Sequence, residues 1–236
     1  MMSNPATHDF AVLASGQAVA SGQTVYAQWY RDTIVGDIYL TSNGTELTGL
    51  WFSDHQKYWE PKPEDILTQP GNGCSSTDDS GNRVLGAGNH GADNQGKEGF
   101  GASDLPIFEQ TRTWLDAYFA GTDPGPIPPV NPYRVTPFRR MVCEEMCKIP
   151  YGETTTYGAI AQALAKRLGK QKMSARAVGG GVGHNPIGII IPCHRVVGAN
   201  KSLTGDGGGM SRKIALLELE GFDMTQFTVP TKGTAL

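Results

Sequence analysis

Residues 189–196 read IIIPCHRV, and they place a thiol, Cys193, directly beside an imidazole, His194, at the end of an apolar run. The apolar run predicts a buried strand that reaches the surface at Pro192. A thiol is a weak nucleophile at neutral pH until a base takes its proton, and a histidine held by a carboxylate is a common base for this step. A lone Cys–His pair is more often an inert buried cysteine beside a structural histidine, so the neighbouring motifs decide the interpretation.

The segment preceding this stretch predicts three helices. Thr136-Pro137 opens the first, and Pro150 ends it. The next two are expected at about Tyr157 to Leu168 and Ser174 to Gly181, with a turn between them. This pair has the proportions of a helix-turn-helix, and small side chains dominate its second helix.

The first half of the chain predicts a small antiparallel sheet. Runs of apolar residues separated by turn residues place its strands at Val25–Tyr30, Ile34–Leu40 and Leu47–Phe52. Asp104 is expected to cap a helix that begins at Pro106 and stops at Gly121. The five prolines between Asp123 and Pro132 are typical of an extended linker.

The expected fold class is therefore α/β of the α+β kind: a small N-terminal antiparallel-sheet domain and a mainly helical C-terminal domain with a helix-turn-helix. The domain boundaries are expected as a disordered tail at 1–23, an N-terminal α/β domain at 24–130, a C-terminal domain at 131–222 and a tail at 223–236. Residues 70–104 are rich in Gly, Asn, Asp and Ser, which predicts a flexible insertion in the N-terminal domain.

Charge is distributed unevenly between the two halves. Residues 131–221 carry 13 Lys and Arg against 6 Asp and Glu, whereas residues 1–130 carry 6 against 16. A basic domain can bind phosphate even when the whole chain has a net charge of −3, because the field acts over about 8 Å at physiological salt. The alternative is that the lysines and arginines of residues 166–172 only solvate a helix end.

The cysteine spacing and the lengths of the apolar stretches argue against a zinc protein, a membrane protein and an exported protein. The four cysteines form no Cys-x-x-Cys pair, and the spacing of Cys143 and Cys147 indicates core packing rather than a zinc site. No stretch approaches the roughly 20 apolar residues of a membrane span, and no export signal is evident, so we expect a cytoplasmic protein without a membrane partner.

Several further motifs accompany the IIIPCHRV stretch in a fixed order. They are Tyr151–Gly158 (YGETTTYG), Ala175–Gly181 (ARAVGGG), Asn185-Pro186, Gly205–Gly209 (GDGGG) and Leu219–Gly221 (LEG). In this order and at this spacing the chain resembles the O6-alkylguanine-DNA alkyltransferases, also called methylated-DNA–protein-cysteine methyltransferases. The likeness is strong over residues 131–222 and weaker over 24–130.

The resemblance implies DNA repair by irreversible, stoichiometric transfer of an alkyl group from O6-alkylguanine, or also O4-alkylthymine, to Cys193. It implies that His194 withdraws the thiol proton through a water, that Glu220 orients His194, and that Asn185 braces the adjacent turn. Tyr157 matches the tyrosine that protonates the departing guanine and crowds the target phosphate. The reaction needs no cofactor and no metal, and the protein is expected to act as a monomer on double-stranded DNA that carries alkylated bases.

The second helix of the expected helix-turn-helix matches the part that contacts DNA. Its small residues permit close approach to a groove wall without reading the base sequence. Arg176 matches the arginine that fills the space left when the damaged nucleotide flips out. The residues expected to contact DNA are Arg176, Tyr157, Ser174, Ala175, Ala177 and Gly179.

Two competing functions remain open at this point. A non-catalytic alkyltransferase-like protein would bind lesions without repairing them, but such proteins carry another residue in place of Cys193. A thiol hydrolase using Cys193 and His194 would need an oxyanion hole and a substrate cleft, and it would not need the helix-turn-helix. A hydrolase turns over, whereas a suicide alkyltransferase stops at one equivalent.

Asp206 departs from the family pattern, since relatives usually have an aromatic residue there. Loss of that ring could cost on the order of 1–3 kcal/mol of base stacking. The carboxylate would either raise the pKa of the thiol by repulsion or accept hydrogen bonds from the exocyclic amine of guanine.

We predict that Asp206 weakens alkylguanine repair. Asp206→Tyr should then repair a methylated duplex faster than the parent protein, as measured by the single-turnover rate. A variant no faster than the parent would contradict this hypothesis.

Overall fold

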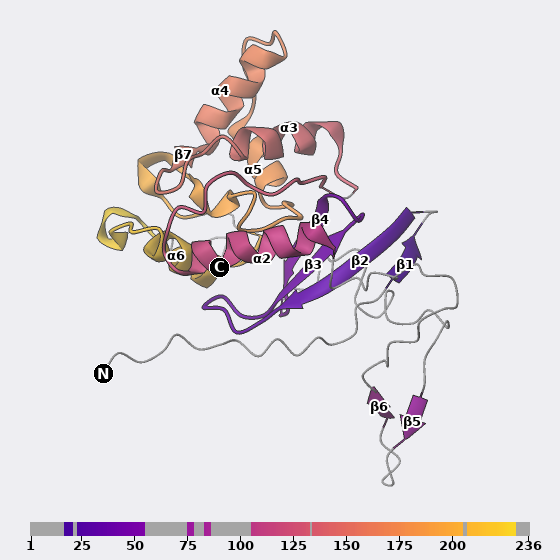
Figure 1. Ribbon diagram of the computed structural model, residues 1–236. Helices are drawn as coiled ribbons and strands as arrows, with labels where there is room; N and C mark the ends of the chain where they lie inside the picture. Colours follow the sequence, from indigo (N-terminus) through magenta and orange to yellow (C-terminus); the bar gives the residue numbers. More distant parts are fainter. Residues whose placement is uncertain are drawn as a thin grey trace, which may run out of the picture.

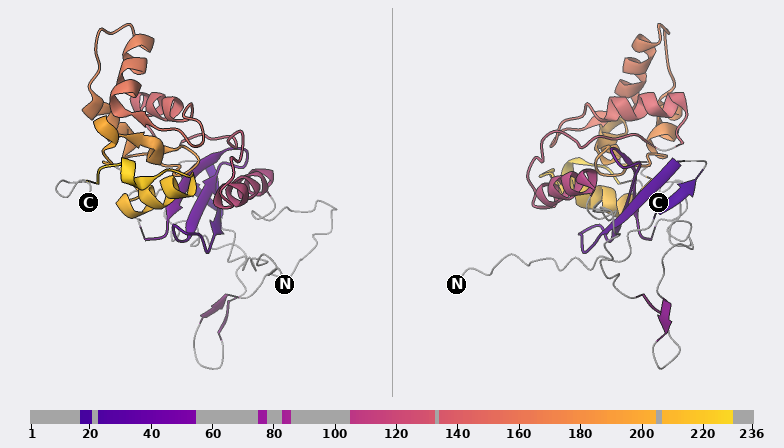
Figure 2. Two further views of the ribbon diagram at one scale, coloured as in Figure 1. Left: turned by 90° about the vertical axis from the view of Figure 1, so that its left-hand side faces the viewer. Right: turned by 45° about the vertical axis from the view of Figure 1, so that its right-hand side comes forward.

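The computed structural model describes residues 17–20, 23–54, 75–77, 83–85, 105–132, 134–204 and 207–229. Figures 1 and 2 show the helices α3, α4 and α5 grouped on one side of the molecule, with a sheet and the helix α2 on the other. The chain thus combines an antiparallel sheet with a mainly helical second half, as the sequence predicts. In the described parts of the chain, no helix is both long and apolar enough to cross a membrane.

The N-terminal sheet has four antiparallel strands in sequential order. They are β1 (Gln17–Ala20), β2 (Gln23–Tyr30), β3 (Ile38–Ser42) and β4 (Leu47–Phe52). The turn between β3 and β4 closes through Asn43, whose side-chain oxygen accepts from the backbone N–H groups of Thr45 and Glu46. This is the Asx-type turn chemistry that the Ser-Asn-Gly sequence predicts.

Two expectations for the N-terminal half are wrong in detail. Residues 1–23 were expected to lack structure, but Gln17–Ala20 pairs with β2 as strand β1. The third strand begins at Ile38 rather than Ile34, because Thr33 and Gly36 form a turn in which Gly36 has φ +91°. Within the expected insertion, Ser75–Thr77 and Arg83–Leu85 form the antiparallel pair β5 and β6; the rest of 70–104 lies outside the described residues.

Helix α2 (Pro106–Phe119) packs against β3 and joins the sheet to the core. Its N-cap residue is Leu105, which makes no side-chain cap, and the predicted cap Asp104 lies outside the described residues. The hydroxyl of Tyr30 on β2 donates to Asp116 Oδ1 at 2.7 Å. Gly121 follows the helix with φ +74°, which confirms the predicted stop.

The second half consists of α3 (Pro137–Met146), α4 (Tyr157–Arg167), α5 (Ala175–Val182) and α6 (Met210–Leu219). The first begins as predicted, since the side chain of Thr136 accepts from the N–H of Arg139 and Pro137 occupies the first turn. Two strands of two residues each, β7 (Thr155–Thr156) and β8 (Val196–Val197), pair in parallel. Helices α3, α4 and α5 pack on one another.

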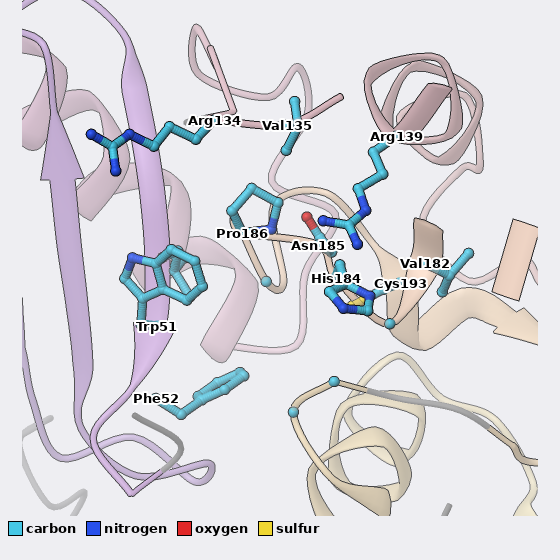
Figure 3. A pocket seen from close by; sticks show the side chains of 15 residues that line it. Trp51, Phe52, Arg134, Val135, Arg139, Val182, His184, Asn185, Pro186 and Cys193 are labelled. Atoms are coloured by element: carbon cyan, nitrogen blue, oxygen red, sulfur yellow. The ribbon is translucent and has the colours of Figure 1, made fainter. Parts of the chain in front are cut away.

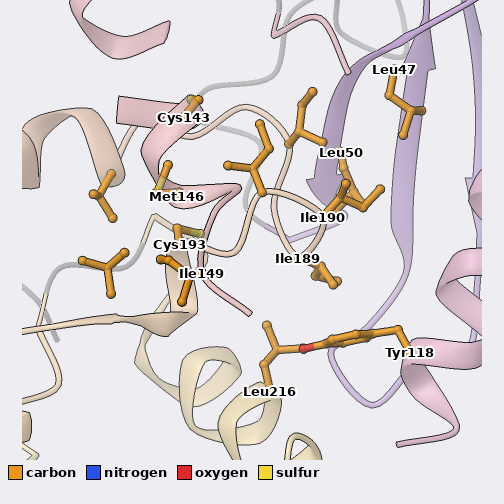
Figure 4. Packing of buried hydrophobic residues seen from close by; sticks show 14 of the residues in the cluster. Leu47, Leu50, Tyr118, Cys143, Met146, Ile149, Ile189, Ile190, Cys193 and Leu216 are labelled. Atoms are coloured by element: carbon orange, nitrogen blue, oxygen red, sulfur yellow. The ribbon is translucent and has the colours of Figure 1, made fainter. Parts of the chain in front are cut away.

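One hydrophobic core spans both halves of the chain. Leu40, Leu50 and Phe108 from the first half belong to the same buried cluster as Met146 and Ile190 from the second. Figure 4 shows this packing around Cys193 and Tyr118. The two halves predicted as separate domains therefore share their interior, and the first half contributes to the surroundings of the thiol.

The strand expected before Cys193 is absent, and a tight turn takes its place. Ile189 has φ +63°, a conformation that a β-branched residue rarely adopts. The N–H of Ile190 donates to Gly188 O at 2.7 Å, and the N–H of Ile191 donates to Ile187 O at 3.0 Å. The apolar run is buried as predicted. Its start makes one isolated parallel bridge, between Ile187 and Leu50 of β4, and the N–H groups of Ile190 and Ile191 then bond within the turn instead of extending the sheet.

Close packing of α5 on α3 gives a test of this fold. A Cβ added at Gly181 would lie 2.9 Å from Val142 Cγ2, whereas one added at Gly180 would meet nothing within 4 Å. Both alanine substitutions gain the same helix propensity, so the difference isolates the clash. We expect Gly181→Ala to be less stable than Gly180→Ala by about 1–3 kcal/mol in urea denaturation. Equal free energies of unfolding would contradict the packing of these helices.

Candidate active site

Cys193 opens a single helical turn, η3 (Cys193–Arg195), directly after Pro192. Its backbone N–H donates to Ile191 O at 2.8 Å, and it takes no part in a disulfide bond. The residue is 7% exposed, and it lines a cavity. Figure 3 shows the sulfur at the inner end of this cavity.

The cavity next to Cys193 has a volume of about 220 Å³ and walls from both halves of the chain. Trp51 and Phe52, at the end of β4, form an aromatic wall opposite Val182 at the end of α5. Arg139 and His184 add positive or polar side chains to the lining. The remaining lining residues are Leu50, Arg134, Val135, Gly183, Asn185, Pro186, Gly188, Gly207 and Gly208.

His194 is buried and oriented by a carboxylate. Its Nε2 lies 2.7 Å from Glu220 Oε1, and both side chains are 0% exposed. Because the ionised carboxylate can only accept, Nε2 carries the proton and Nδ1 is the basic nitrogen. Within the described residues, Nδ1 has no protein hydrogen-bond partner. The imidazole next to the thiol thus presents an unused acceptor.

Glu220 follows the last turn of α6 and accepts hydrogen bonds from three parts of the chain: η3, Gly152 and α2. Arg195 donates to both carboxylate oxygens at 2.9–3.0 Å, and the N–H of Gly152 donates to Oε2 at 3.2 Å. The hydroxyl of Tyr118 donates to Oε1 at 2.9 Å. Burial by itself would raise the pKa of Glu220, but the hydrogen bonds and charges of His194 and Arg195 outweigh it and lower the pKa to about 2.

Sequence reasoning missed Arg195 and Tyr118. Arg195 belongs to the quoted stretch and is buried at 6% exposure, which is unusual for arginine and requires a partner such as Glu220. It also donates to Ile149 O at 2.8 Å. Tyr118 had no signal beyond helical periodicity, because it looks like any core position of α2.

Asn185 fixes the turn that leads to the thiol. Its side-chain nitrogen donates to Ile191 O at 2.7 Å and to Ile187 O at 3.3 Å, while its oxygen accepts from the N–H of Ile187 at 3.1 Å. These bonds satisfy backbone groups that would otherwise need a sheet partner. Asn185 therefore acts on the backbone before Cys193 and also lines the cavity.

The residues expected to contact DNA lie on and beside α5, away from the Cys193 cavity. Ser174, Ala175, Arg176 and Ala177 are exposed at the start of this helix. The other two, Tyr157 and Gly179, line a second groove together with Thr156, Gly158, Ala175, Arg176, Gly198, Ala199 and Thr204. Four of the six, Tyr157, Ala175, Arg176 and Gly179, thus line one groove, and none of the six lines the thiol cavity. Their contact with DNA stays a prediction.

Tyr157 is engaged with the loop that precedes α6. Its hydroxyl donates to Thr204 O at 2.6 Å, and this carbonyl also accepts from the buried Lys213 at 3.2 Å. Tyr157 is not among the residues that line the Cys193 cavity. Asp206 lies outside the described residues, while the following Gly207 and Gly208 line that cavity.

Two other described cysteines differ from Cys193. Cys143 and Cys147 lie on and just after α3, and both pack in or against the core. Burial raises the pKa of the Cys143 thiol to about 12 and that of the Cys147 thiol to about 11. Both remain protonated at neutral pH, so neither is an activated nucleophile.

Comparison with known families places residues 137–222 in the family described as 6-O-methylguanine DNA methyltransferase, DNA binding domain. A methylated-DNA–protein-cysteine methyltransferase of Mycobacterium bovis is 50% identical over 106 residues, which cover 45% of this chain and 61% of that protein. The protein of the same name from Methanosarcina acetivorans is 46% identical over 115 residues, covering 49% of this chain and 70% of that protein. The first of these matches thus spans about three fifths of the relative's length.

Solved structures extend the likeness to most of the chain. A variant of the Mycobacterium tuberculosis O6-methylguanine methyltransferase is 33% identical to this chain and superposes with a TM-score of 0.56. The match covers 85% of this chain and 98% of the M. tuberculosis chain. The M. tuberculosis OGT in complex with DNA is 31% identical, covers 85% and 94%, and has a TM-score of 0.52. The similarity therefore includes the N-terminal half.

The buried charge of Glu220 predicts a pH dependence of stability. Its folded pKa of about 2 is below the ordinary 4.5, so its contribution is present above pH 4.5 and is lost as the pH falls towards 2. This contribution amounts to about 3 kcal/mol. The free energies of unfolding of the parent and of Glu220→Gln should be measured by denaturation from pH 6 to pH 2. The difference between them should become smaller by about 3 kcal/mol over this range. A constant gap would contradict the assignment.

Proposed function

The chain belongs to the methylated-DNA–protein-cysteine methyltransferase family, and from that membership we propose that it repairs DNA by moving the alkyl group of O6-alkylguanine onto its own Cys193. The observation that carries the proposal is the buried thiol at the inner end of a cavity, next to a histidine held by Glu220. The same chemistry would apply to O4-alkylthymine, whose alkyl group is also bonded to an exocyclic oxygen of the base.

The first step is activation of the thiol. His194 Nδ1 accepts the proton of Cys193 by way of a bridging water, and Glu220 stabilises the resulting imidazolium through Nε2. The ion pair is favoured because Glu220 stays ionised at neutral pH. Asn185 keeps the preceding turn in place, which fixes the direction of the thiolate.

The second step is transfer of the alkyl group. The thiolate sulfur attacks the alkyl carbon in line, the new C–S bond forms as the C–O bond breaks, and the electron pair goes to the guanine oxygen. The hydroxyl of Tyr157 exchanges Thr204 O for the departing base and donates its proton to that base. The resulting phenolate takes up a proton from water, and the His194 imidazolium returns its proton to water, so that both side chains end neutral. The product is a thioether that none of these residues can cleave, so each molecule acts once. The transfer as written requires no cofactor or metal.

DNA is the expected partner because the alkylated oxygen lies on the paired edge of the base and must leave the duplex to reach a buried thiol. The exposed small residues at the start of α5 allow close approach to a groove, and Arg176 is available to occupy the vacated place in the stack. The net charge of residues 131–221 favours phosphate contacts. We propose a monomer that acts in the cytoplasm.

The decisive experiment is intact-protein mass spectrometry after incubation with a duplex that contains O6-methylguanine, beside Cys193→Ala as a control. We expect a gain of one methyl group per molecule, localised to Cys193 and absent from the control. Lesion-specific binding without a mass change would instead identify a non-catalytic lesion-binding protein. Continued turnover of an acyl substrate would identify a thiol hydrolase.

A further inference from the structure

Tyr118 brings the N-terminal half of the chain into direct contact with the charged pair behind the thiol. It lies on α2 and is 0% exposed. Its hydroxyl donates to Glu220 Oε1 at 2.9 Å and lies 3.3 Å from His194 Nε2. Figure 4 shows the Tyr118 side chain extending from α2 towards Leu216 on α6, the helix that ends at Glu220.

We propose that Tyr118 is a positioning residue for alkyl transfer, whose hydroxyl holds Glu220 Oε1 in the orientation that keeps Nε2 of His194 protonated and Nδ1 free to accept the thiol proton. This inference rests on the proposed function. It assigns to the N-terminal half a direct part in activating Cys193, which lies on the other half of the chain.

The geometry at Oε1 explains why a further donor matters. This oxygen accepts from His194 at 2.7 Å, from Tyr118 at 2.9 Å and from Arg195 at 3.0 Å. Arg195 donates to both oxygens through Nε and Nη2, which aligns the carboxylate with the guanidinium group. The phenol approaches from a separate helix, so it restricts the carboxylate to the orientation that also accepts from His194.

The hydroxyl remains a donor over the whole working range of pH. Burial raises the pKa of Tyr118 far above its ordinary value, and the charge of Glu220 raises it further, while Arg195 opposes this. The other groups that face Glu220 are His194, Arg195 and the backbone N–H of Gly152, with the ring of Tyr151 beneath the Arg195 guanidinium at 5.6 Å. Tyr118 and the neutral imidazole of His194 are thus the uncharged side-chain donors to Glu220, and Arg195 is the charged one.

Packing of the Tyr118 ring does not depend on its hydroxyl. The ring stacks on Trp114 with centroids 5.5 Å apart and meets Phe119 and Tyr151 edge to face at 5.5 and 6.1 Å. Phenylalanine would keep these contacts and remove only the donor. The orientation of Glu220 can therefore be tested separately from the fold.

The experiment compares Tyr118→Phe with Tyr30→Phe in single-turnover transfer from an O6-methylguanine duplex. Tyr30 is a matched control, because its hydroxyl donates to a carboxylate, Asp116, on the same helix but away from the site. We expect Tyr118→Phe to slow transfer about ten-fold and Tyr30→Phe to leave the rate unchanged. Mass spectrometry should still give one methyl group per molecule at the end of both reactions.

The rate–pH profile provides a readout that a purely structural role would not change. The hydroxyl of Tyr118 draws negative charge from Glu220 Oε1, so its removal leaves more negative charge on the carboxylate that faces His194. The acidic limb of the profile should therefore move to higher pH in Tyr118→Phe. Incorporation of 3-fluorotyrosine at position 118 makes the hydroxyl a stronger donor in an unchanged fold, and should move the limb to lower pH.

A double-mutant cycle with Glu220→Gln completes the test. If Tyr118 acts through Glu220, adding Tyr118→Phe to Glu220→Gln should cause little further loss of rate. The inference is overturned if the rate and profile of Tyr118→Phe match the parent, or if its loss is the same in both backgrounds. Failure of the parent itself to gain a methyl group would instead refute the proposed function.

Discussion

The buried carboxylate of Glu220 is the charge on which the rest of the site depends. With its side chain 0% exposed, an ionised carboxylate is stable only if it is paired and hydrogen-bonded, and Arg195, His194 and Tyr118 supply those bonds. These partners come from η3 and α2, while Glu220 itself ends α6. The same set of bonds therefore joins three elements and determines which nitrogen of the imidazole is basic.

The shared core gives the N-terminal half a chemical role as well as a structural one. Its strand β4 ends in Trp51 and Phe52, which wall the cavity of Cys193, and its helix α2 carries Tyr118. The backbone of β4 also touches the turn before the thiol, since the N–H of Leu50 donates to Pro186 O at 2.8 Å. A change that separates the two halves would thus open the cavity and leave Glu220 with one donor fewer.

Helix α5 carries small residues on two faces, one packed against α3 and one exposed. On its inner face Gly181 permits close contact with Val142 of α3, which fixes the helix against the core. On its outer face the small residues and Arg176 are exposed. A helix that approaches a groove closely must itself be rigid, and the inner glycine makes this possible without adding bulk to the outer face.

The sequence by itself determined the helices and most of the sheet, because caps, turns and periodicity act within about four residues along the chain. It also singled out the adjacent Cys193 and His194 as candidates for the reaction. It failed before Cys193, where the apolar run suggested a strand and the side chain of Asn185 instead closes a turn. It assigned Glu220 to His194 only through a family resemblance, and it gave no sign of Tyr118. These partners are separated by 26 and 102 residues along the chain. Only the tertiary structure could decide them, since a hydrogen bond between distant segments leaves no local pattern, and the burial that makes it strong arises when the segments pack together.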